Sequence, residues 1–265
     1  MKSKNFLEKF NFKKKLIFII GGSGLIGSAI SKNFISLGAK IVIVDFKNSK
    51  KKLKNVNYYN LDKKNDYDDD IFLNKLFNNY GCPDIFINAS YPRTKDWASN
   101  SFKNIKPFSM KKNVDMHLNF FCWSTRVVAE NMKKKKKKGK IILLNSIYGI
   151  RGQDQNIYIN TNMSENMTYS IIKGGITNFV RQAGSYFGRY NIQINSIISG
   201  GVKGHVSGIS KSQNKNFIRN YSKKCPMKRL AQPEEIANLV TYLSSDASDY
   251  INASNIVIDG GITAI

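Results

Sequence analysis

The chain has 265 residues, of which 42% are hydrophobic and 12% aromatic, so it can bury a large core and global disorder is excluded. Basic residues outnumber acidic ones by 42 to 18, and the formal net charge of +24 favours anionic partners such as phosphates or nucleotides. The lysines are scattered along the chain, which is typical of a solvated surface. No later segment approaches the ~18 apolar residues of a membrane span. We therefore expect a small-molecule partner, and neither a nucleic acid nor a membrane.

The cysteines and histidines predict no metal site. Cys82, Cys122 and Cys225 are far apart and odd in number, and they form neither a metal-ligand spacing nor a disulfide framework. Free cysteines fit a reducing compartment, so we expect a cytoplasmic protein. His117 and His205 are too few and too far apart for a zinc site.

Short apolar runs alternate with longer periodic stretches along the whole chain. The first apolar run, after Lys13–Lys15, resembles a signal peptide, but it also fits a buried strand, a glycine turn and a helix. Strands are predicted at 16–20, 41–45, 56–60, 84–88, 140–145, 192–198 and 255–259, and helices at about 25–37, 69–79, 109–132, 168–187 and 232–245. This alternation predicts an α/β fold, a doubly wound parallel sheet of about seven strands with helices on both faces, as one domain over 1–265.

Two segments, 90–108 and 201–226, show no regular pattern. A long polar insertion in a compact domain often forms a lid, so we expect a substrate lid at about 201–226. The densest basic run, Lys133–Lys138, is predicted to be a solvated helix C-terminus, with a nucleic-acid patch as the alternative. The lid carries basic residues that would suit an anionic substrate: Lys203, Lys211, Lys215, Arg219, Lys223 and Lys224.

A glycine-rich turn, GGSGLIG at residues 21–27, directly follows the first predicted strand. Glycines at positions 21, 24 and 27 allow a tight turn, close approach of a pyrophosphate and close packing of the helix on the strand. The next helix directs its first N–H groups at such phosphates. A strand before the turn and a helix after it are the context that a dinucleotide-binding motif requires, with a turn that binds no cofactor as the alternative.

Asp45, at the end of the second predicted strand, favours NAD over NADP. It lies 24 residues after Gly21, near the position of a ribose-binding carboxylate. Its two oxygens can accept hydrogen bonds from both ribose hydroxyls and would repel a 2′-phosphate. Lys47 and Lys50 weaken this preference.

A possible proton-transfer pair occurs three times as Tyr-x-x-x-Lys, and context must choose among the copies: Tyr59/Lys63, Tyr91/Lys95 and Tyr169/Lys173. Tyr59 lies on a predicted strand, where residues four apart are separated by roughly 13 Å. Pro92 pushes Tyr91 out of helical conformation. Only Tyr169 and Lys173 lie on a predicted helix, where positions four apart share a face.

These features occur in the order typical of short-chain dehydrogenases/reductases, which the chain resembles over about residues 12–263. Other residues that carry the resemblance are Asn88 in INAS, Ser146 in LNSIYG and the tail PMKRLAQPEEIANLVTYLSSDASDYINASNIVIDGG. Through SIYG and a long insert before Tyr169, the chain is most similar to bacterial oxidoreductases of surface-sugar and flagellin-modification pathways. The resemblance implies a Rossmann-type fold and a homotetramer or homodimer, the tetramer formed through the 109–132 and 168–187 helices and the C-terminal strand.

The resemblance also implies roles for individual residues. Tyr169 would exchange a proton with the substrate oxygen while hydride passes to or from a nicotinamide. Lys173 would lower the pKa of Tyr169 through its ammonium charge and bind the nicotinamide ribose. Ser146 would hold the reacting oxygen. The implied cofactor-binding residues are Gly21, Ser23, Gly24, Leu25, Ile26, Gly27, Asp45, Asp62, Asn88, Tyr169, Lys173 and Val202.

The chain departs from the family pattern at several positions. Ile20 stands where Thr is usual, Ser90 ends INAS where Gly is usual, and Ser199 replaces a Pro. Ser146 and Tyr169 are 23 residues apart, a longer spacing than is usual in the family. The extra residues lie beside the predicted active site, so we expect them to shape substrate binding.

His117 stands where the family has a fourth catalytic residue, an Asn, and Asn119 follows two residues later. With a reference pKa near 6.5, His117 could relay protons. The alternative is a helix histidine without a catalytic part.

More than one function remains open from the sequence. The first is an NAD(P)-dependent oxidoreductase acting on a polar alcohol or ketone, such as a sugar or nucleotide-sugar intermediate of carbohydrate biosynthesis. The second is a non-catalytic cofactor-binding sensor or assembly protein on the same fold. The third is nucleic-acid binding through the lysine-rich surface, which would depend strongly on salt.

Overall fold

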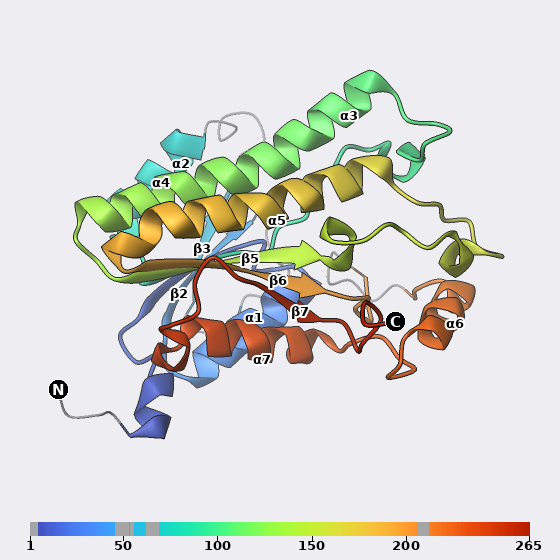
Figure 1. Ribbon diagram of the computed structural model, residues 1–265. Coiled ribbons are helices and arrows are strands. Elements are labelled where there is room, and N and C mark those ends of the chain that lie inside the picture. The colour runs from blue at the N-terminus through green and yellow to red at the C-terminus, as the bar shows by residue number, and fades with distance from the viewer. Residues whose placement is uncertain (1–4, 46–52, 54–55, 62–68, 206–211) are drawn as a thin grey trace.

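A computed structural model of the protein describes residues 5–45, 53, 56–61, 69–205 and 212–265 (Figure 1). Its centre is a seven-stranded sheet with the strand order β3-β2-β1-β4-β5-β6-β7, in which all neighbouring strands are parallel. The strands are β1 (Leu16–Ile20), β2 (Lys40–Asp45), β3 (Val56–Asn60), β4 (Ile85–Asn88), β5 (Gly139–Ser146), β6 (Ile192–Ser199) and β7 (Asn255–Ile258). The predicted single-domain, doubly wound α/β fold is confirmed.

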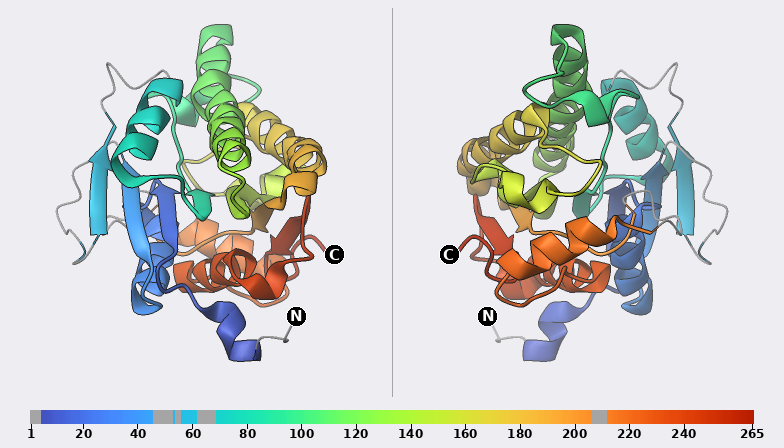
Figure 2. Two further views of the ribbon diagram at one scale, coloured as in Figure 1. Left: turned by 90° about the vertical axis from the view of Figure 1, so that its left-hand side faces the viewer. Right: turned by 90° about the vertical axis from the view of Figure 1, so that its right-hand side faces the viewer.

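Helices cover both faces of the sheet (Figures 1 and 2). On one face lie α2 (Asp69–Tyr80), α4 (Phe120–Lys134) and α5 (Met167–Phe187), and on the other lie α1 (Leu25–Ser36) and α7 (Pro233–Ser244). Successive residues of a strand point to opposite faces, so β1 contributes to two separate cores. Phe18 packs in the core under α2, α4 and α5, while Ile17 and Ile19 pack in the core under α1 and α7. The signal-like apolar run is thus β1, its turn and α1.

The helix predicted at 109–132 has a defect in the middle. It consists of α3 (Pro107–Asn113), a π-helical turn (Val114–Asn119) and α4. A π-turn inserts an extra residue into the helix and often occurs at functional sites. Here the turn contains His117, which the family resemblance predicts to take the position of an Asn.

The prediction of an irregular segment at 201–226 was wrong for part of its length, because α6 (Lys215–Lys224) lies within it. Asn214 caps this helix by accepting hydrogen bonds from the N–H groups of Asn216, at 2.9 Å, and Phe217, at 3.1 Å. Phe217 and Tyr221, one turn apart, pack into a small third core. Figure 1 shows α6 beyond the carboxyl ends of the strands.

The basic run Lys133–Lys138 begins in the last turn of α4, as predicted for a helix C-terminus. Three of its members are not simply solvated, and the first of them, Lys133, forms an ion pair with Glu130 at 3.3 Å. Lys137 forms an ion pair with Asp84 at 3.2 Å, and Lys138 forms one with Asp249 at 2.6 Å. Among the described helices, none has the length and apolar character needed to span a membrane.

Candidate functional site

The candidate site lies where the strand order reverses, between β1 and β4, because the connections that follow these strands diverge there and leave a crevice. The glycine turn follows β1 and begins at Gly21, which has a left-handed φ of +74°. A Cβ on Gly21 would lie 2.7 Å from the Cα of Ser90, in the loop after β4. A Cβ on Gly27 would overlap the carbonyl oxygen of Gly21. Both positions therefore require glycine.

The turn fits the pyrophosphate of a dinucleotide. Gly24 is the N-cap of α1, and Leu25 and Ile26 begin its first turn, where backbone N–H groups have no intrahelical partner. The hydroxyl of Ser23 is buried and makes no hydrogen bond to any of the described residues. A buried polar group without a partner is costly, and a phosphate oxygen would supply one.

The other predicted cofactor residues lie at the same edge of the sheet, with one exception. Asp45 ends β2, and its Oδ2 accepts a hydrogen bond from the Ser23 N–H at 3.1 Å. Asn88 ends β4 and fixes the following turn by accepting a 2.6 Å hydrogen bond from the Ser90 hydroxyl. Val202 lies just after β6 and pairs with Ala231 in an isolated bridge. The exception is Asp62, which lies outside the described residues, as do Lys47, Lys50 and Lys211.

Ser146, Tyr169 and Lys173 are close together, as predicted. Ser146 ends β5, and its side chain lies close enough to the hydroxyl of Tyr169 on α5 to lower the pKa of that hydroxyl. Lys173 is buried, and its Nζ donates a 3.0 Å hydrogen bond to the Leu144 carbonyl, 5.6 Å from the Tyr169 ring centroid. Asn166 caps α5 by accepting a hydrogen bond from the Tyr169 N–H at 2.9 Å, which fixes the start of the helix.

The expected lowering of the Tyr169 pKa was wrong for the protein alone. Desolvation raises the pKa of Tyr169, the nearby Tyr91 raises it further, and the hydrogen bond from Ser146 only partly opposes this. Burial also lowers the pKa of Lys173, to about 7. In dry surroundings the neutral form of each group is favoured, so this pair carries less charge than an exposed pair would.

Three aromatic rings that the sequence did not mark as functional surround Tyr169. The ring centroids of Tyr91, Trp97 and Tyr148 lie 5.7, 6.0 and 6.2 Å from that of Tyr169. Tyr91 belongs to a rejected Tyr-x-x-x-Lys pair, and it contributes through its ring and not through Lys95. The available signal was that the irregular segment 90–108 contains aromatic residues, Tyr91 and Trp97 among them, for which an unstructured polar loop has no need.

His117 is completely buried beside this aromatic group. Its ring centroid lies 5.6 Å from that of Tyr91 and 5.1 Å from that of Phe121. Desolvation, and then the charge of Lys173, lower the pKa of His117 well below its usual value, so the imidazole is neutral at neutral pH. Neither ring nitrogen has a hydrogen-bond partner within the described parts of the chain. Asn119 instead faces Asp115, to which it donates a 3.0 Å hydrogen bond.

A buried polar network, which the sequence also did not reveal, holds the loop after β4 against α5. Asn113 accepts a 2.9 Å hydrogen bond from the Thr94 N–H and donates one of the same length to the Ser109 carbonyl. Asn100 accepts a 2.8 Å hydrogen bond from the Thr168 hydroxyl, next to Tyr169. The network thus positions the loop that carries Tyr91 and Trp97. Within the described ranges, no cluster of three or more His, Cys, Asp or Glu side chains could hold a metal ion.

A doubly wound parallel sheet with a phosphate turn at its reversal point defines a dinucleotide-binding fold. A family model described as enoyl-(acyl carrier protein) reductase matches residues 23–263, which is nearly the whole chain. The chain belongs to the short-chain dehydrogenase/reductase family and is an oxidoreductase. The predicted family and enzyme class are therefore confirmed.

Three relatives show what the chain is similar to in sequence and structure. The chain is 27% identical to the post-translational flagellin modification protein A of Campylobacter coli, covering 94% of this chain and 98% of that protein. It is 25% identical to a sorbose reductase of Candida albicans, covering 98% and 90%. A solved short-chain dehydrogenase from Leptospira borgpetersenii with bound NAD+ is 29% identical and superposes with a TM-score of 0.84, covering 99% of this chain and 97% of that one.

Proposed function

We propose that this protein is a nicotinamide-dependent reductase that interconverts a ketone and an alcohol on a polar substrate, with Tyr169 as the general acid and base. One observation carries the proposal. Ser146, at the end of β5, lies close enough to the Tyr169 hydroxyl to influence its pKa, one helical turn from Lys173 and at the same edge of the sheet as the glycine turn. This arrangement provides both a proton donor and a second hydroxyl for one reacting oxygen.

Each residue of the proposed site has its own role in cofactor binding or proton transfer. A bound nicotinamide dinucleotide supplies the hydride. The glycine turn with Ser23 binds its pyrophosphate, Asp45 its adenosine ribose and Lys173 its nicotinamide ribose. In reduction, the Ser146 hydroxyl holds the substrate carbonyl oxygen, and the Tyr169 hydroxyl gives that oxygen a proton as negative charge develops. In oxidation the same proton returns to Tyr169.

The raised pKa of Tyr169 suits the general-acid role that we propose for it in reduction. Desolvation keeps its hydroxyl protonated at neutral pH, as a general acid needs. Lys173, with a pKa near 7, can exchange a proton with its surroundings at neutral pH. His117 is a further member of the proposed site, because a neutral imidazole with two open nitrogens can hold a water and pass a proton through it.

NAD is the cofactor that we propose over NADP. The carboxylate of Asp45 is held next to the glycine turn by the Ser23 N–H, where a 2′-phosphate would place like charges together. The Leptospira relative contains NAD+. Titration of the wild-type protein with NADH and NADPH, followed by nicotinamide fluorescence, tests this, and tighter binding of NADPH would contradict it.

The proposed substrate class is a sugar or nucleotide-sugar intermediate of carbohydrate biosynthesis. Two relatives support it by name, one in flagellin modification and one as a sorbose reductase. The described basic residues of the segment 201–226 suit an anionic substrate: Lys203, Lys215, Arg219, Lys223 and Lys224. We propose that this segment, with α6, forms the lid over the substrate.

The decisive experiment is the variant Tyr169→Phe. Purified protein is mixed with NADH and a panel of keto sugars and nucleotide sugars, and the loss of nicotinamide absorbance is followed. Turnover should fall by about 10²- to 10⁴-fold, because the proton donor is lost while the ring remains. The affinity for NADH should be unchanged.

Tyr242→Phe is the matched control, because Tyr242 lies on α7 on the opposite face of the sheet and is 38% exposed. It should retain wild-type turnover. Undiminished turnover in Tyr169→Phe would refute the proposed acid, and failure of the wild type to bind any nicotinamide would refute the function as a whole.

We further propose a cytoplasmic homotetramer. All three cysteines are free thiols, as a reducing compartment allows. Apolar side chains exposed on the predicted interface elements would be covered by assembly: Trp123 on α4, Ile171 and Tyr186 on α5, and Val257 on β7. Light scattering on the eluting protein would test this, and a monomer mass would contradict it.

A further inference from the structure

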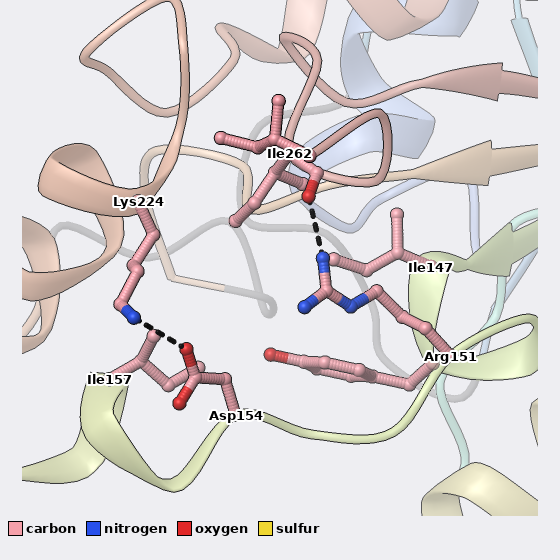
Figure 3. A pocket seen from close by; sticks show the side chains of 8 residues that line it. Ile147, Arg151, Asp154, Ile157, Lys224 and Ile262 are labelled. Atoms are coloured by element: carbon pink, nitrogen blue, oxygen red, sulfur yellow. Dashed lines mark hydrogen bonds and ion pairs between the residues drawn. The ribbon is translucent and has the colours of Figure 1, made fainter.

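A cavity of about 210 Å³ lies between the insert before α5, α6 and the C-terminal segment (Figure 3). Its walls are mostly apolar. Ile147, Ile157 and Ile262 line it and are each less than 8% exposed. Apolar walls with a few polar groups are typical of a small-molecule site.

Two cationic side chains face this cavity from opposite sides, as Figure 3 shows. Lys224 of α6 is already paired, with its Nζ 3.3 Å from the Asp154 carboxylate. Arg151 donates from Nη1 to the Ile262 carbonyl and has no carboxylate partner among the described residues. A guanidinium has five N–H donors, so Arg151 retains several for a ligand. The charged side chains that line the cavity are two cations and one carboxylate.

The cavity is held in shape by contacts between the insert and α6. From α6, Asn220 donates a 2.9 Å hydrogen bond to the Ile159 carbonyl, and Asn216 donates a 2.6 Å hydrogen bond to the Asn160 carbonyl. The ion pair of Lys224 with Asp154 also joins the two segments. Because these contacts exist without a ligand, the binding geometry is largely pre-formed, which reduces the entropic cost of binding.

A second set of contacts connects the cavity with the proposed catalytic residues. Tyr148 lines the cavity, and its ring lies 6.2 Å from the ring of Tyr169. The insert is joined to α5 by Gln153, which accepts a 3.0 Å hydrogen bond from the Tyr158 hydroxyl and donates one of 2.9 Å to Ser170, the neighbour of Tyr169. The cavity and Tyr169 are therefore connected through Tyr148 and through the insert.

We propose that this cavity binds an anionic group of the substrate, a carboxylate or a phosphate, through a charge-assisted hydrogen bond from Arg151, while the reacting carbon lies at Tyr169. The proposal rests on the proposed function and specifies its substrate class, an acidic polar ketone or alcohol. A planar guanidinium suits both anions because it can donate two parallel hydrogen bonds to either. The cavity is smaller than a typical pocket for a whole ligand, so it suits one end of the substrate.

The test measures binding and needs no turnover. Ligand-observed NMR titrations of the NAD-bound protein use three probes: glucuronate for the carboxylate, glucose 6-phosphate for the phosphate, and glucose as the neutral control. For Arg151→Gln, the affinity for at least one acidic probe should fall about tenfold or more, as expected for loss of a charged hydrogen bond. The affinity for glucose should stay within about twofold.

Arg181→Gln, an exposed arginine on the surface of α5, is the matched control and should bind all probes as the wild type does. Lys224→Gln is a second variant of the cavity, and it too should weaken the acidic probe, because an unpaired Asp154 then repels it. Circular dichroism and a melting curve establish that each variant is folded.

Acidic probes that bind Arg151→Gln and Lys224→Gln as tightly as the wild type would overturn the proposal. An equal loss of affinity for glucose would overturn it too, and so would a change of oligomeric state in Arg151→Gln with unchanged probe binding, which would identify the cavity as a subunit contact. The same titrations are repeated without NAD, so that the test of the cavity does not depend on the proposed function. If no nicotinamide binds, the function fails, while the charge dependence of the cavity is still measured.

Discussion

The site has two halves that are built in different ways. The nucleotide half is the glycine turn 21–27 with Asp45, and the substrate half is the group of side chains around Tyr169. In the nucleotide half, the main chain sets which residues are allowed. Gly21 has a left-handed φ, and a Cβ on Gly21 or on Gly27 would overlap neighbouring main-chain atoms. In the substrate half, side chains from segments far apart in sequence meet around Tyr169: Tyr91, Trp97, His117 and Tyr148. The first half can be described by one contiguous motif. In the second half, single side chains can be replaced independently to suit a different substrate.

The largest effect on cofactor affinity is expected from a side chain placed in the nucleotide half. In Gly27→Val, the Cβ would overlap the Gly21 carbonyl oxygen and lie 2.8 Å from the Gly22 Cα, so the turn must move. We expect NADH affinity to fall about 100-fold or more, and the free energy of unfolding to fall by about 2–3 kcal/mol, as for other overpacked sites. Fluorescence titration and urea unfolding measure the two effects.

Gly152→Val is the control, because a Cβ on Gly152 would meet no atom within 4 Å. Its stability should stay within about 0.5 kcal/mol of the wild type, as at most surface positions. If Gly27→Val bound NADH like the wild type, the steric account of the nucleotide half would be incorrect.

The backbone character of the nucleotide half explains why so much of it could be predicted from the sequence. Every predicted strand lies within two residues of the observed one, since strands buried on both faces appear as continuous apolar runs. The helix α6 was missed because its apolar residues are few and its surroundings are polar. The cap at Asn214 and the pair Phe217 and Tyr221, one turn apart, were the signals that could have revealed it.

The substrate half could be predicted only in part, because its properties depend on burial. The spacing of Tyr169 and Lys173 on one helix was sufficient to bring them together. The sequence could not give the direction of the Tyr169 pKa shift, since that depends on how many rings exclude water from the phenol. Tyr91 was rejected as a proton-transfer residue because Pro92 excludes it from a helix, although its ring contacts Tyr169 in the folded protein.

The next largest effect is expected in the substrate half, from Lys173→Met. The Lys173 pKa is about 7 in the folded protein and about 10.4 in the unfolded chain, so between these values the unfolded state binds more protons. Stability therefore rises with pH across this range, and the cost of burying the charge is fully present below pH 7. The variant should be more stable than the wild type by about 2–4 kcal/mol near pH 7, less the loss of one hydrogen bond to Leu144.

Urea unfolding at several pH values between 6.5 and 10 measures this difference, which should shrink steadily as the pH rises. Turnover should be lost in the same variant, because stability and function oppose each other at this residue. Lys32→Met, on the exposed side of α1, should change stability by no more than about 0.5 kcal/mol at any pH. A stability gain independent of pH would mean that charge burial is not its cause.

The smallest effect is expected from His117→Asn, which installs the residue that the family resemblance predicts at this position. If the two open nitrogens of His117 hold a water beside Lys173, an Asn amide can replace one of them, and turnover should fall by less than about tenfold. His117→Phe keeps the ring volume but has no polar atom, so its turnover should fall about 10²-fold, the lower end for a lost proton-transfer group.

The pH profile of turnover separates a positioning role from direct titration of the histidine. Because desolvation holds the His117 pKa well below its usual range, the profile between pH 6 and 8 should be the same in the wild type and in His117→Asn. Equal losses in the Asn and Phe variants would mean that His117 only fills space in the π-helical turn. In that case the substrate half would resemble the nucleotide half more closely, because packing would fix this position as it fixes the glycines.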